Sequence, residues 1–175
     1  LFKEIKSFLK LQKIARQNKV VCYTAYNHRF EPHFVKMKKI INSKKLGRLY
    51  SCRIFYGNGT AKLVKKNWRD SGKGVRTDLL PHLLDICKFW FGKNLKGFKL
   101  VSSNKFENKA PDHALFISEK GSIKINLEIS YVMWKNTFTC DLLASNGSAH
   151  INNLCKWGKS TYTLRKRRFP SGKPD

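Results

Sequence analysis

The second half of the chain is a series of short apolar runs separated by turn signals. Five runs rich in β-branched and aromatic residues follow Gly92, over residues 98–102, 113–118, 122–131, 137–144 and 160–164. Between them, residues 119–121 (Glu-Lys-Gly) and 145–147 (Ser-Asn-Gly) have the composition of hairpin turns. Strands joined by such turns pair with their neighbours in the chain, so this pattern predicts an antiparallel meander.

Two amphipathic helices and a further strand precede these runs. The first helix begins at Pro32 and ends near residues 45–47, and the second covers residues 79–91 with Pro81 in its first turn. Between them, residues 50–56 alternate as a strand does. Helices packed on one face of the sheet give an α+β fold with an open, mainly antiparallel sheet, whose other face is open to a partner.

The start of the chain has a different pattern. Residues 3–18 have a helical period that ends at Asn18, and residues 20–26 form a short apolar run typical of a buried strand. A helix that leads into a buried strand is half of an α/β unit. The chain also lacks an initiator Met, and we therefore expect it to be cut out of something longer.

Cysteine usage and hydropathy favour a reducing cytoplasm. The five cysteines are far apart and form no Cys-x-x-Cys pair, so neither a disulfide framework nor a metal site is indicated. Cys22, Cys52 and Cys140 lie in apolar runs, where a free cysteine usually packs as a small core residue. No apolar run approaches the ~20 residues that span a bilayer, and the start does not resemble a signal peptide.

The formal net charge of +25 raises the alternative of a binding module for nucleic acid or another polyanion. Lys and Arg, however, occur at the polar positions of every segment, and the only dense run is Arg165–Arg168. No zinc finger, helix-turn-helix or ribonucleoprotein motif accompanies them, which argues against nucleic acid as a partner. Steep salt dependence of binding to DNA or RNA would support this alternative.

A carboxylate and an imidazole stand four residues apart behind a glycine-containing loop, at Asp78 and His82. At this spacing they share a helix face or a helix entrance, about 6 Å apart, where a carboxylate can stabilise an imidazolium for proton transfer. A structural alternative explains the same spacing. Asp78 would then be a helix cap, and His82 and Asp85 solvated residues of the first turn.

Taken in order, the motifs of this chain resemble the Gfo/Idh/MocA family of NAD(P)-dependent oxidoreductases. The resemblance extends weakly through the sheet and so covers essentially the whole chain. The pieces that carry it are Tyr26-Asn27-His28-Arg29-Phe30, Pro32, Lys45-Leu46-Gly47-Arg48-Leu49, Trp68-Arg69, the glycine pair, Asp78-Leu79-Leu80-Pro81-His82-Leu83-Leu84-Asp85 and Phe89-Trp90-Phe91-Gly92.

The resemblance implies a two-domain enzyme, of which this chain holds mainly the second part. Residues 1–26 would be the last helix and strand of the dinucleotide-binding domain, and residues 27–175 the C-terminal substrate and oligomerisation domain. No Gly-x-Gly-x-x-Gly occurs in the chain, and the family's catalytic lysine would fall just before Leu1. The isolated chain is therefore expected to be inactive.

The resemblance also assigns the site residues. Asp78 and His82 match the catalytic aspartate and histidine, which also contact a sugar or polyol substrate, while Asn27 and the pair Trp68-Arg69 match positions beside the nicotinamide of NAD or NADP. Arg29 matches an arginine near the substrate. A domain-interface ion pair for Arg29 and a core position for Trp68 are the structural alternatives.

Two further expectations follow from the resemblance. Asp85 orients or caps within its own helix, and the open sheet carries a homodimer or homotetramer contact. A non-catalytic relative that keeps the fold for partner binding is another alternative. Relatives usually have about three glycines before the aspartate, whereas Lys73 and Arg76 intrude here, so the substrate would carry a phosphate or a carboxylate.

Overall fold

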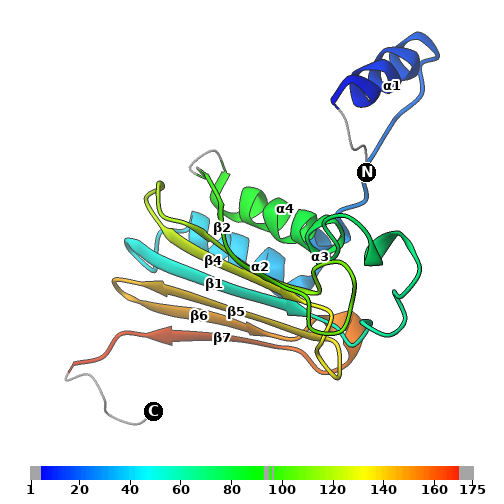
Figure 1. The fold of residues 1–175 in the computed structure, drawn as a ribbon. Coiled ribbons are helices and arrows are strands. Elements are labelled where there is room, and N and C mark those ends of the chain that lie inside the picture. The colour runs from blue at the N-terminus through cyan, green and yellow to red at the C-terminus, as the bar shows by residue number, and fades with distance from the viewer. Residues whose placement is uncertain (1–4, 93–94, 96, 170–175) are drawn as a thin grey trace.

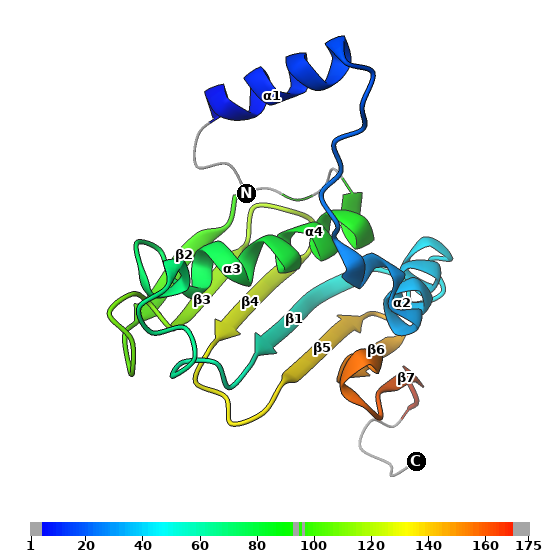
Figure 2. The ribbon, with the colours of Figure 1, turned by 90° about the vertical axis from the view of Figure 1, so that its right-hand side faces the viewer.

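A computed structural model describes residues 5–92, 95 and 97–169 of the chain. Its central feature is one seven-stranded sheet, in the order β2-β3-β4-β1-β5-β6-β7, with helices α2 and α4 on one face (Figures 1 and 2). The predicted α+β class with an open, mainly antiparallel sheet is confirmed. The helices are α1 (Ile5–Gln17), α2 (Pro32–Asn42), α3 (Val75–Asp78) and α4 (Leu80–Phe91), and the strands are β1 (Leu49–Gly57), β2 (Lys99–Asn104), β3 (His113–Ser118), β4 (Lys124–Ser130), β5 (Thr137–Ala144), β6 (Gly147–Asn152) and β7 (Thr161–Lys166).

The predicted meander is interrupted at its centre by β1. This strand runs parallel to β4, with Ile54 opposite Leu127, and antiparallel to β5, with Ile54 opposite Cys140. Hairpin signals specify only which neighbouring strands are joined by a tight turn, and residues 131–136 between β4 and β5 leave room for a third strand. The sheet also contains β6, which pairs with β5 after the predicted turn at 145–147 but was not among the predicted runs.

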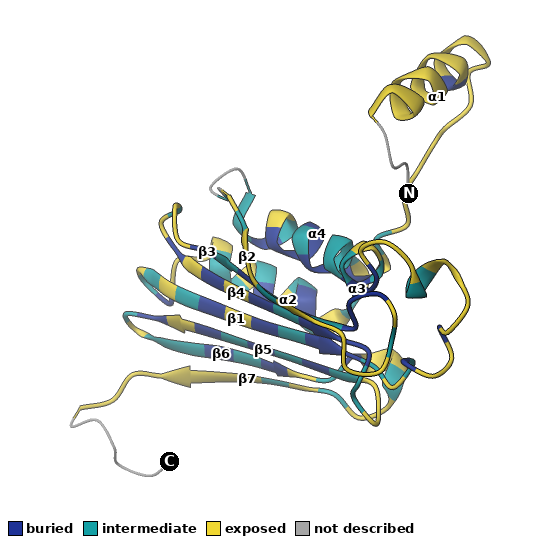
Figure 3. Ribbon diagram, viewed as in Figure 1, coloured by how far each residue is buried: buried dark blue, intermediate teal, exposed yellow. Residues whose placement is uncertain are grey.

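The hydrophobic core lies between the sheet and the two helices. Alternate residues of β1, β4 and β5 are buried, as the stripes in Figure 3 show. Phe34 of α2 packs against Trp90 of α4 and Phe138 of β5, with ring centroids 5.2 and 4.9 Å apart. The indole N–H of Trp90 donates to the Phe34 carbonyl at 3.1 Å, so the two helices are fixed to each other as well as to the sheet.

The start of the chain is only partly as predicted. The helix is confirmed as α1, apart from residues 3–4, which lie outside the described residues, but residues 20–26 form no strand. A strand needs a neighbour for its backbone groups, and no described residue pairs with this segment. Cys22 is consequently exposed rather than buried, whereas Cys52, Cys87 and Cys140 lie in the core. Figure 1 shows α1 standing apart from the sheet and its helices.

None of the helices in the described part of the chain is both long enough and apolar enough to cross a membrane.

Candidate active site

The site is built around the glycine that precedes α3. Gly74 has φ +51°, and a Cβ atom there would lie 2.1 Å from the carbonyl oxygen of Pro111. The close approach lets the N–H of Val75 donate to that same carbonyl at 2.8 Å. This contact fixes the start of α3 against the loop before β3, and with it the position of Asp78 at the end of α3.

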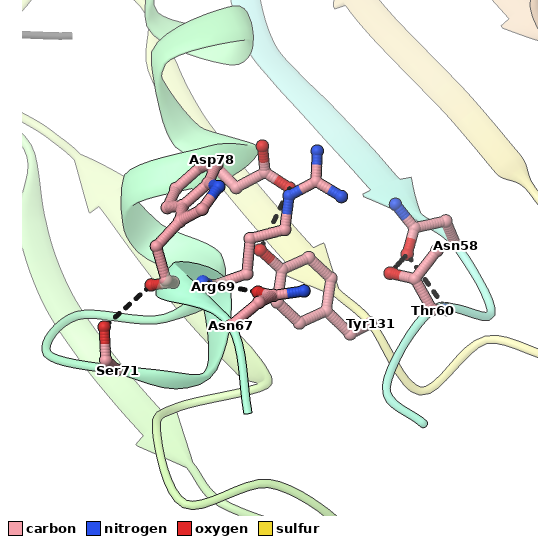
Figure 4. Close-up of polar contacts among 8 residues, drawn as sticks. Asn58, Thr60, Asn67, Arg69, Ser71, Asp78 and Tyr131 are labelled. Carbon is pink, nitrogen blue, oxygen red and sulfur yellow. Dashed lines mark hydrogen bonds and ion pairs between the residues drawn. The ribbon is translucent and has the colours of Figure 1, made fainter. Parts of the chain in front are cut away.

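Asp78 is held by two groups from other elements. The hydroxyl of Tyr131, directly after β4, donates to Asp78 Oδ2 at 3.0 Å, and Arg69 Nε lies 3.2 Å from the same oxygen (Figure 4). The arginine contact is at ion-pair distance without hydrogen-bond geometry. The carboxylate is 17% exposed, so it is partly screened from water but still accessible.

Arg69 is placed by a local cap. The side-chain oxygen of Asn67 accepts from the backbone N–H of Arg69 at 2.8 Å, and Ser71 closes the turn by donating to the Trp68 carbonyl at 2.8 Å (Figure 4). This short 3₁₀ helix, Trp68–Asp70, directs the arginine to Asp78, while the guanidinium carbon lies 5.3 Å from the centre of the Trp68 ring. Trp68 itself is 59% exposed, so the core position offered as its structural alternative is wrong.

His82 lies in the first turn of α4, on the other side of the short break between α3 and α4. Pro81 occupies the first turn as predicted. Asp78 does not cap α4, whose N-cap is Leu79, and Asp85 is buried, so the alternative of a capping Asp78 and a solvated Asp85 is wrong. Within the described residues no hydrogen bond joins Asp78 to His82, and His82 Nδ1 is buried without a partner.

Arg29 is paired with Asp85 by both arms of its fork. Arg29 Nε donates to Asp85 Oδ2 at 2.6 Å, and Nη2 donates to Oδ1. The pair joins the 3₁₀ helix Asn27–Phe30 to α4, so Asp85 does not cap its own helix as expected. Asn27 starts the same 3₁₀ helix and is exposed.

Burial dominates the electrostatics around His82. Its pKa is lowered by burial and by the charge of Lys156, against the opposing effects of Asp78 and Asp85. The neighbouring His28, whose ring centroid is 4.8 Å from that of His82, has its pKa lowered to about 3, mostly by burial. Both imidazoles are therefore neutral near pH 7, and a neutral imidazole can accept a proton.

Two tyrosines share this environment. Burial, followed by the charge of Asp78, raises the pKa of Tyr56 to about 12 and also raises that of Tyr131. Tyr131 therefore keeps its proton at neutral pH and remains a hydrogen-bond donor to Asp78.

Sequence reasoning missed three residues that the fold brings to this cluster. Tyr131 was considered only as the end of a strand, His28 only as part of a motif, and Lys156 not at all. Lys156 Nζ lies 3.3 Å from His28 Nε2, although the two residues are 128 positions apart. No spacing in the sequence marks such a contact, because it depends on where the β6–β7 connection folds.

Among the described residues, neither of the two cations in the glycine loop forms an ion pair with Asp78. Lys73 is exposed, and the guanidinium of Arg76 packs 5.9 Å from the ring centre of Phe116 on β3. A nearby surface pocket of about 650 Å³ does not include Asp78 or His82 in its lining, which consists of Lys65, Lys66, Asn67, Asp70, Ser71, Phe106, Glu107, Asn108 and Lys109. Across the described residues, no three His, Cys, Asp or Glu side chains are grouped so that they could hold a metal ion.

Comparison with known proteins identifies the domain. The family model described as the GFO/IDH/MocA C-terminal domain matches residues 34–150. No curated protein matches the chain.

Solved structures share the fold at low identity. Levoglucosan dehydrogenase in complex with NADH and levoglucosan has a TM-score of 0.70 at 18% identity, over 87% of this chain and 45% of its own. An NAD-binding oxidoreductase from Klebsiella pneumoniae has a TM-score of 0.71 at 17% identity, over 94% and 48%. An oxidoreductase from Agrobacterium radiobacter in complex with NAD⁺, L-tartaric acid and magnesium has a TM-score of 0.70 at 14% identity, over 98% and 54%. The chain thus spans about half the length of the structures it matches.

Proposed function

The chain belongs to the Gfo/Idh/MocA family, and from that premise we propose that it is the substrate-binding part of an NAD(P)-dependent oxidoreductase. The enzyme transfers a hydride between the nicotinamide and a hydroxyl or ketone carbon of a sugar, a polyol or a sugar derivative. Residues 1–26 belong to the dinucleotide-binding domain of the same enzyme, and residues 27–175 form the substrate domain.

One observation carries this proposal. Asp78, held by Tyr131 and Arg69, and His82, neutral and partly buried, flank the junction of α3 and α4. A partly accessible carboxylate beside a neutral imidazole is the arrangement that a proton transfer to or from a carbinol oxygen requires. The alternative of a non-catalytic relative gives no role to this arrangement.

The residues of the chain act on the substrate hydroxyl. His82 accepts the hydroxyl proton when the alcohol is oxidised and returns it when the ketone is reduced. The negative charge of Asp78 stabilises the imidazolium that forms, since Asp78 raises the pKa of His82 against the effect of burial. Tyr131 and Arg69 keep the carboxylate in place during this transfer.

NAD or NADP supplies the hydride chemistry when bound. Only the nicotinamide end fits the residues present, because the chain has no Gly-x-Gly-x-x-Gly phosphate-binding turn. Trp68 offers an exposed aromatic ring beside Arg69, whose Nε is buried without a hydrogen bond. Asn27 is exposed at the start of the 3₁₀ helix that also carries His28. We assign these three residues to the nicotinamide side of the cleft.

The substrate class is supported by two of the similar structures. One was solved with levoglucosan, which is a sugar derivative, and another with L-tartaric acid, which carries two hydroxyls. Arg29 stands at the edge of the cluster, and we keep it as a substrate contact, although its fork is already bonded to Asp85.

The sheet face that α2 and α4 leave uncovered serves as the assembly surface in this proposal. Alternate residues of β4 and β5 on that face are only partly buried, among them Glu128 and Asp141. A homodimer or homotetramer formed through this face in the cytoplasm would cover them, and light scattering on the complete protein measures its mass.

The test of the function is kinetic. In the complete protein that carries this chain, Asp78→Asn and His82→Ala should each reduce NAD(P)-dependent oxidation of sugars and polyols by about a hundredfold or more. Lys159→Met, an exposed change in the β6–β7 connection, serves as the control. Full turnover and an unaltered pH profile in His82→Ala would show that His82 is not the proton acceptor.

A further inference from the structure

Lys156 reaches the candidate site from the far end of the chain. It lies in the 3₁₀ helix Cys155–Trp157, between β6 and β7, and its Nζ is 3.3 Å from His28 Nε2. The His28 ring lies next to the His82 ring, with centroids 4.8 Å apart. The lysine charge also acts on both histidines, lowering the pKa of each. Only one ring therefore separates Lys156 from His82.

The backbone that carries Lys156 is anchored on both sides. The N–H of Cys155 donates to Glu31 Oε2 at 3.0 Å, and Leu154 is buried in the core. The ring of Trp157 stacks on Tyr56, with centroids 5.7 Å apart, and Tyr56 in turn lies against His28 at 5.4 Å. Lys156 thus extends from a fixed turn, unlike a lysine on a free surface loop.

Lys156 has no ion-pair partner within the described part of the chain. Its Nζ lies 5.4 Å from the centre of the Trp157 ring, and the charge of Glu31 acts on it from beyond ion-pair distance. No carboxylate of the described residues lies at ion-pair distance from Nζ. The two carboxylates nearest His82 are already paired, Asp78 with Arg69 and Asp85 with Arg29. Lys156 is exposed, so an anion can reach its ammonium, and a charge-assisted hydrogen bond would stabilise that anion beside the buried His28.

The histidine beside Lys156 adds a second signal. An ammonium can only donate, so His28 Nε2 accepts from Lys156, and the ring proton lies on Nδ1. His28 is 2% exposed, and its Nδ1 has no hydrogen-bond partner among the described residues. A buried donor without a partner is costly, which suggests that this arrangement serves binding rather than stability.

We propose that Lys156 binds a carboxylate or phosphate group of the substrate, next to the hydroxyl that His82 deprotonates. The substrate is then an anionic sugar derivative, either a sugar acid or a sugar phosphate. This inference rests on the proposed function for the identity of the reacting hydroxyl. The preference for an acidic substrate is thereby assigned to Lys156, and no longer to Lys73 and Arg76 as the sequence had suggested.

Three sugars that differ in one substituent test the proposal by calorimetry on the complete protein. D-glucuronate carries a carboxylate, α-D-glucose 1-phosphate carries a phosphate, and D-glucose is neutral. We expect Lys156→Met to weaken binding of at least one anionic sugar by about tenfold or more, since a charge-assisted contact is lost. Lys156→Arg should retain much of that affinity, and Lys159→Met should retain all of it.

The outcomes separate this inference from the proposed function. If both anionic sugars bind Lys156→Met as they bind the natural protein, or bind neither form, the assignment of Lys156 is wrong. Binding needs no turnover, so Lys156-dependent binding without any NAD(P) reduction would contradict the proposed function alone. Turnover that depends on His82 while Lys156→Met leaves acidic and neutral sugars equally ranked would contradict this inference alone.

Discussion

At the scale of single residues, the hydrogen bond from the Tyr131 hydroxyl holds the Asp78 carboxylate in position. The hydroxyl is a neutral donor to a carboxylate, and burial raises its pKa so that it keeps the proton. Tyr131→Phe removes only this donor and keeps the buried ring. Because a hydrogen bond to a charged group contributes about 1.5–3 kcal/mol, we expect turnover of the complete enzyme to fall about ten- to a hundredfold.

Tyr50→Phe is the matched control for this change, since Tyr50 is 47% exposed on β1. It should leave turnover within about twofold, as surface substitutions generally have small effects. Equal turnover in Tyr131→Phe and Tyr50→Phe would mean that Arg69 alone suffices to hold Asp78.

Because His28 is buried, the free energy of unfolding of the chain should depend on pH. The pKa of His28 is lowered from 6.5 to about 3 in the folded chain, chiefly by burial and then by Lys156. Between these values the unfolded chain binds more protons, so stability is full above pH 6.5 and falls as the pH drops towards 3. The slope approaches about 1.4 kcal/mol per pH unit for one such histidine.

Urea unfolding of the chain at pH 8, 6.5, 5.5 and 4.5 measures this slope. In His28→Gln the free energy of unfolding should change less steeply with pH below pH 6.5, because the slope that His28 contributes is gone. The slope that His82 contributes should remain, whatever the stability of the variant at pH 8. The same slope in both proteins would show that His28 becomes charged in the folded chain.

The residues of the site differ in how far the sequence predicts them. Asp78, His82 and Arg69 could be named because each lies in a local motif of the family. Lys156 and Tyr131 could not, because they reach the cluster through the sheet, 74 and 49 positions after His82. Their contacts depend on the order of the strands, which is set by how the whole sheet assembles.

At the scale of elements, α3 depends on a glycine. Gly74 combines φ +51° with ψ −130°, and the space that its Cβ would occupy is filled by the carbonyl of Pro111. Gly74→Ala should therefore lower the free energy of unfolding by about 3 kcal/mol or more, because both the backbone and the contact are strained.

Gly72→Ala provides a comparison two residues earlier. Gly72 also has a positive φ, +57°, but nothing lies within 4 Å of its Cβ position. Its cost should be about 1 kcal/mol, from the backbone conformation alone. Urea unfolding of both variants measures the difference. If both lose the same free energy of unfolding, the Pro111 carbonyl moves aside for the new Cβ atom without destabilising the chain.

The sheet shows which part of an element pattern is predictable. Alternation identified β1 and most later strands, because one face of each is buried. It did not predict that β1 enters between β4 and β5, since side-chain alternation gives the faces of a strand and not its neighbours. For the same reason residues 20–26 look like a strand, yet they form none without a partner.

At the scale of the whole molecule, the described residues differ in whether they join the core. The core runs from Phe34 to Tyr162, whereas α1 has only Ala15 buried and leaves Ile5, Leu9 and Ile14 exposed. An amphipathic helix with its apolar face in water has no packing to stabilise it. We attribute this face and residues 20–26 to the dinucleotide-binding domain of the proposed enzyme.

Limited trypsin digestion tests this division. In the 175-residue chain the first cuts should fall in and just after α1, at Lys6, Lys10, Lys13, Arg16 and Lys19, because the backbone there opens readily. The product that starts after Lys19 should persist. Removal of residues 1–19 should change the free energy of unfolding of that product by less than about 1 kcal/mol, since few buried contacts are lost. Early cuts within the sheet would contradict the division.

The complete protein gives the opposite expectation for the same bonds. If residues 20–26 pair inside a parallel sheet there, as the proposed domain requires, their amides gain partners and α1 gains a surface for its apolar face. Cleavage at Lys10, Arg16 and Lys19 should then slow by about tenfold or more, because it needs the second domain to open first. Equal cleavage rates in the chain and in the complete protein would place α1 outside any domain and would remove the support that residues 1–26 give to a dinucleotide-binding partner. Protection at Lys10 and Arg16, with cleavage after Lys19 as fast as in the isolated chain, would limit the shared structure to the helix.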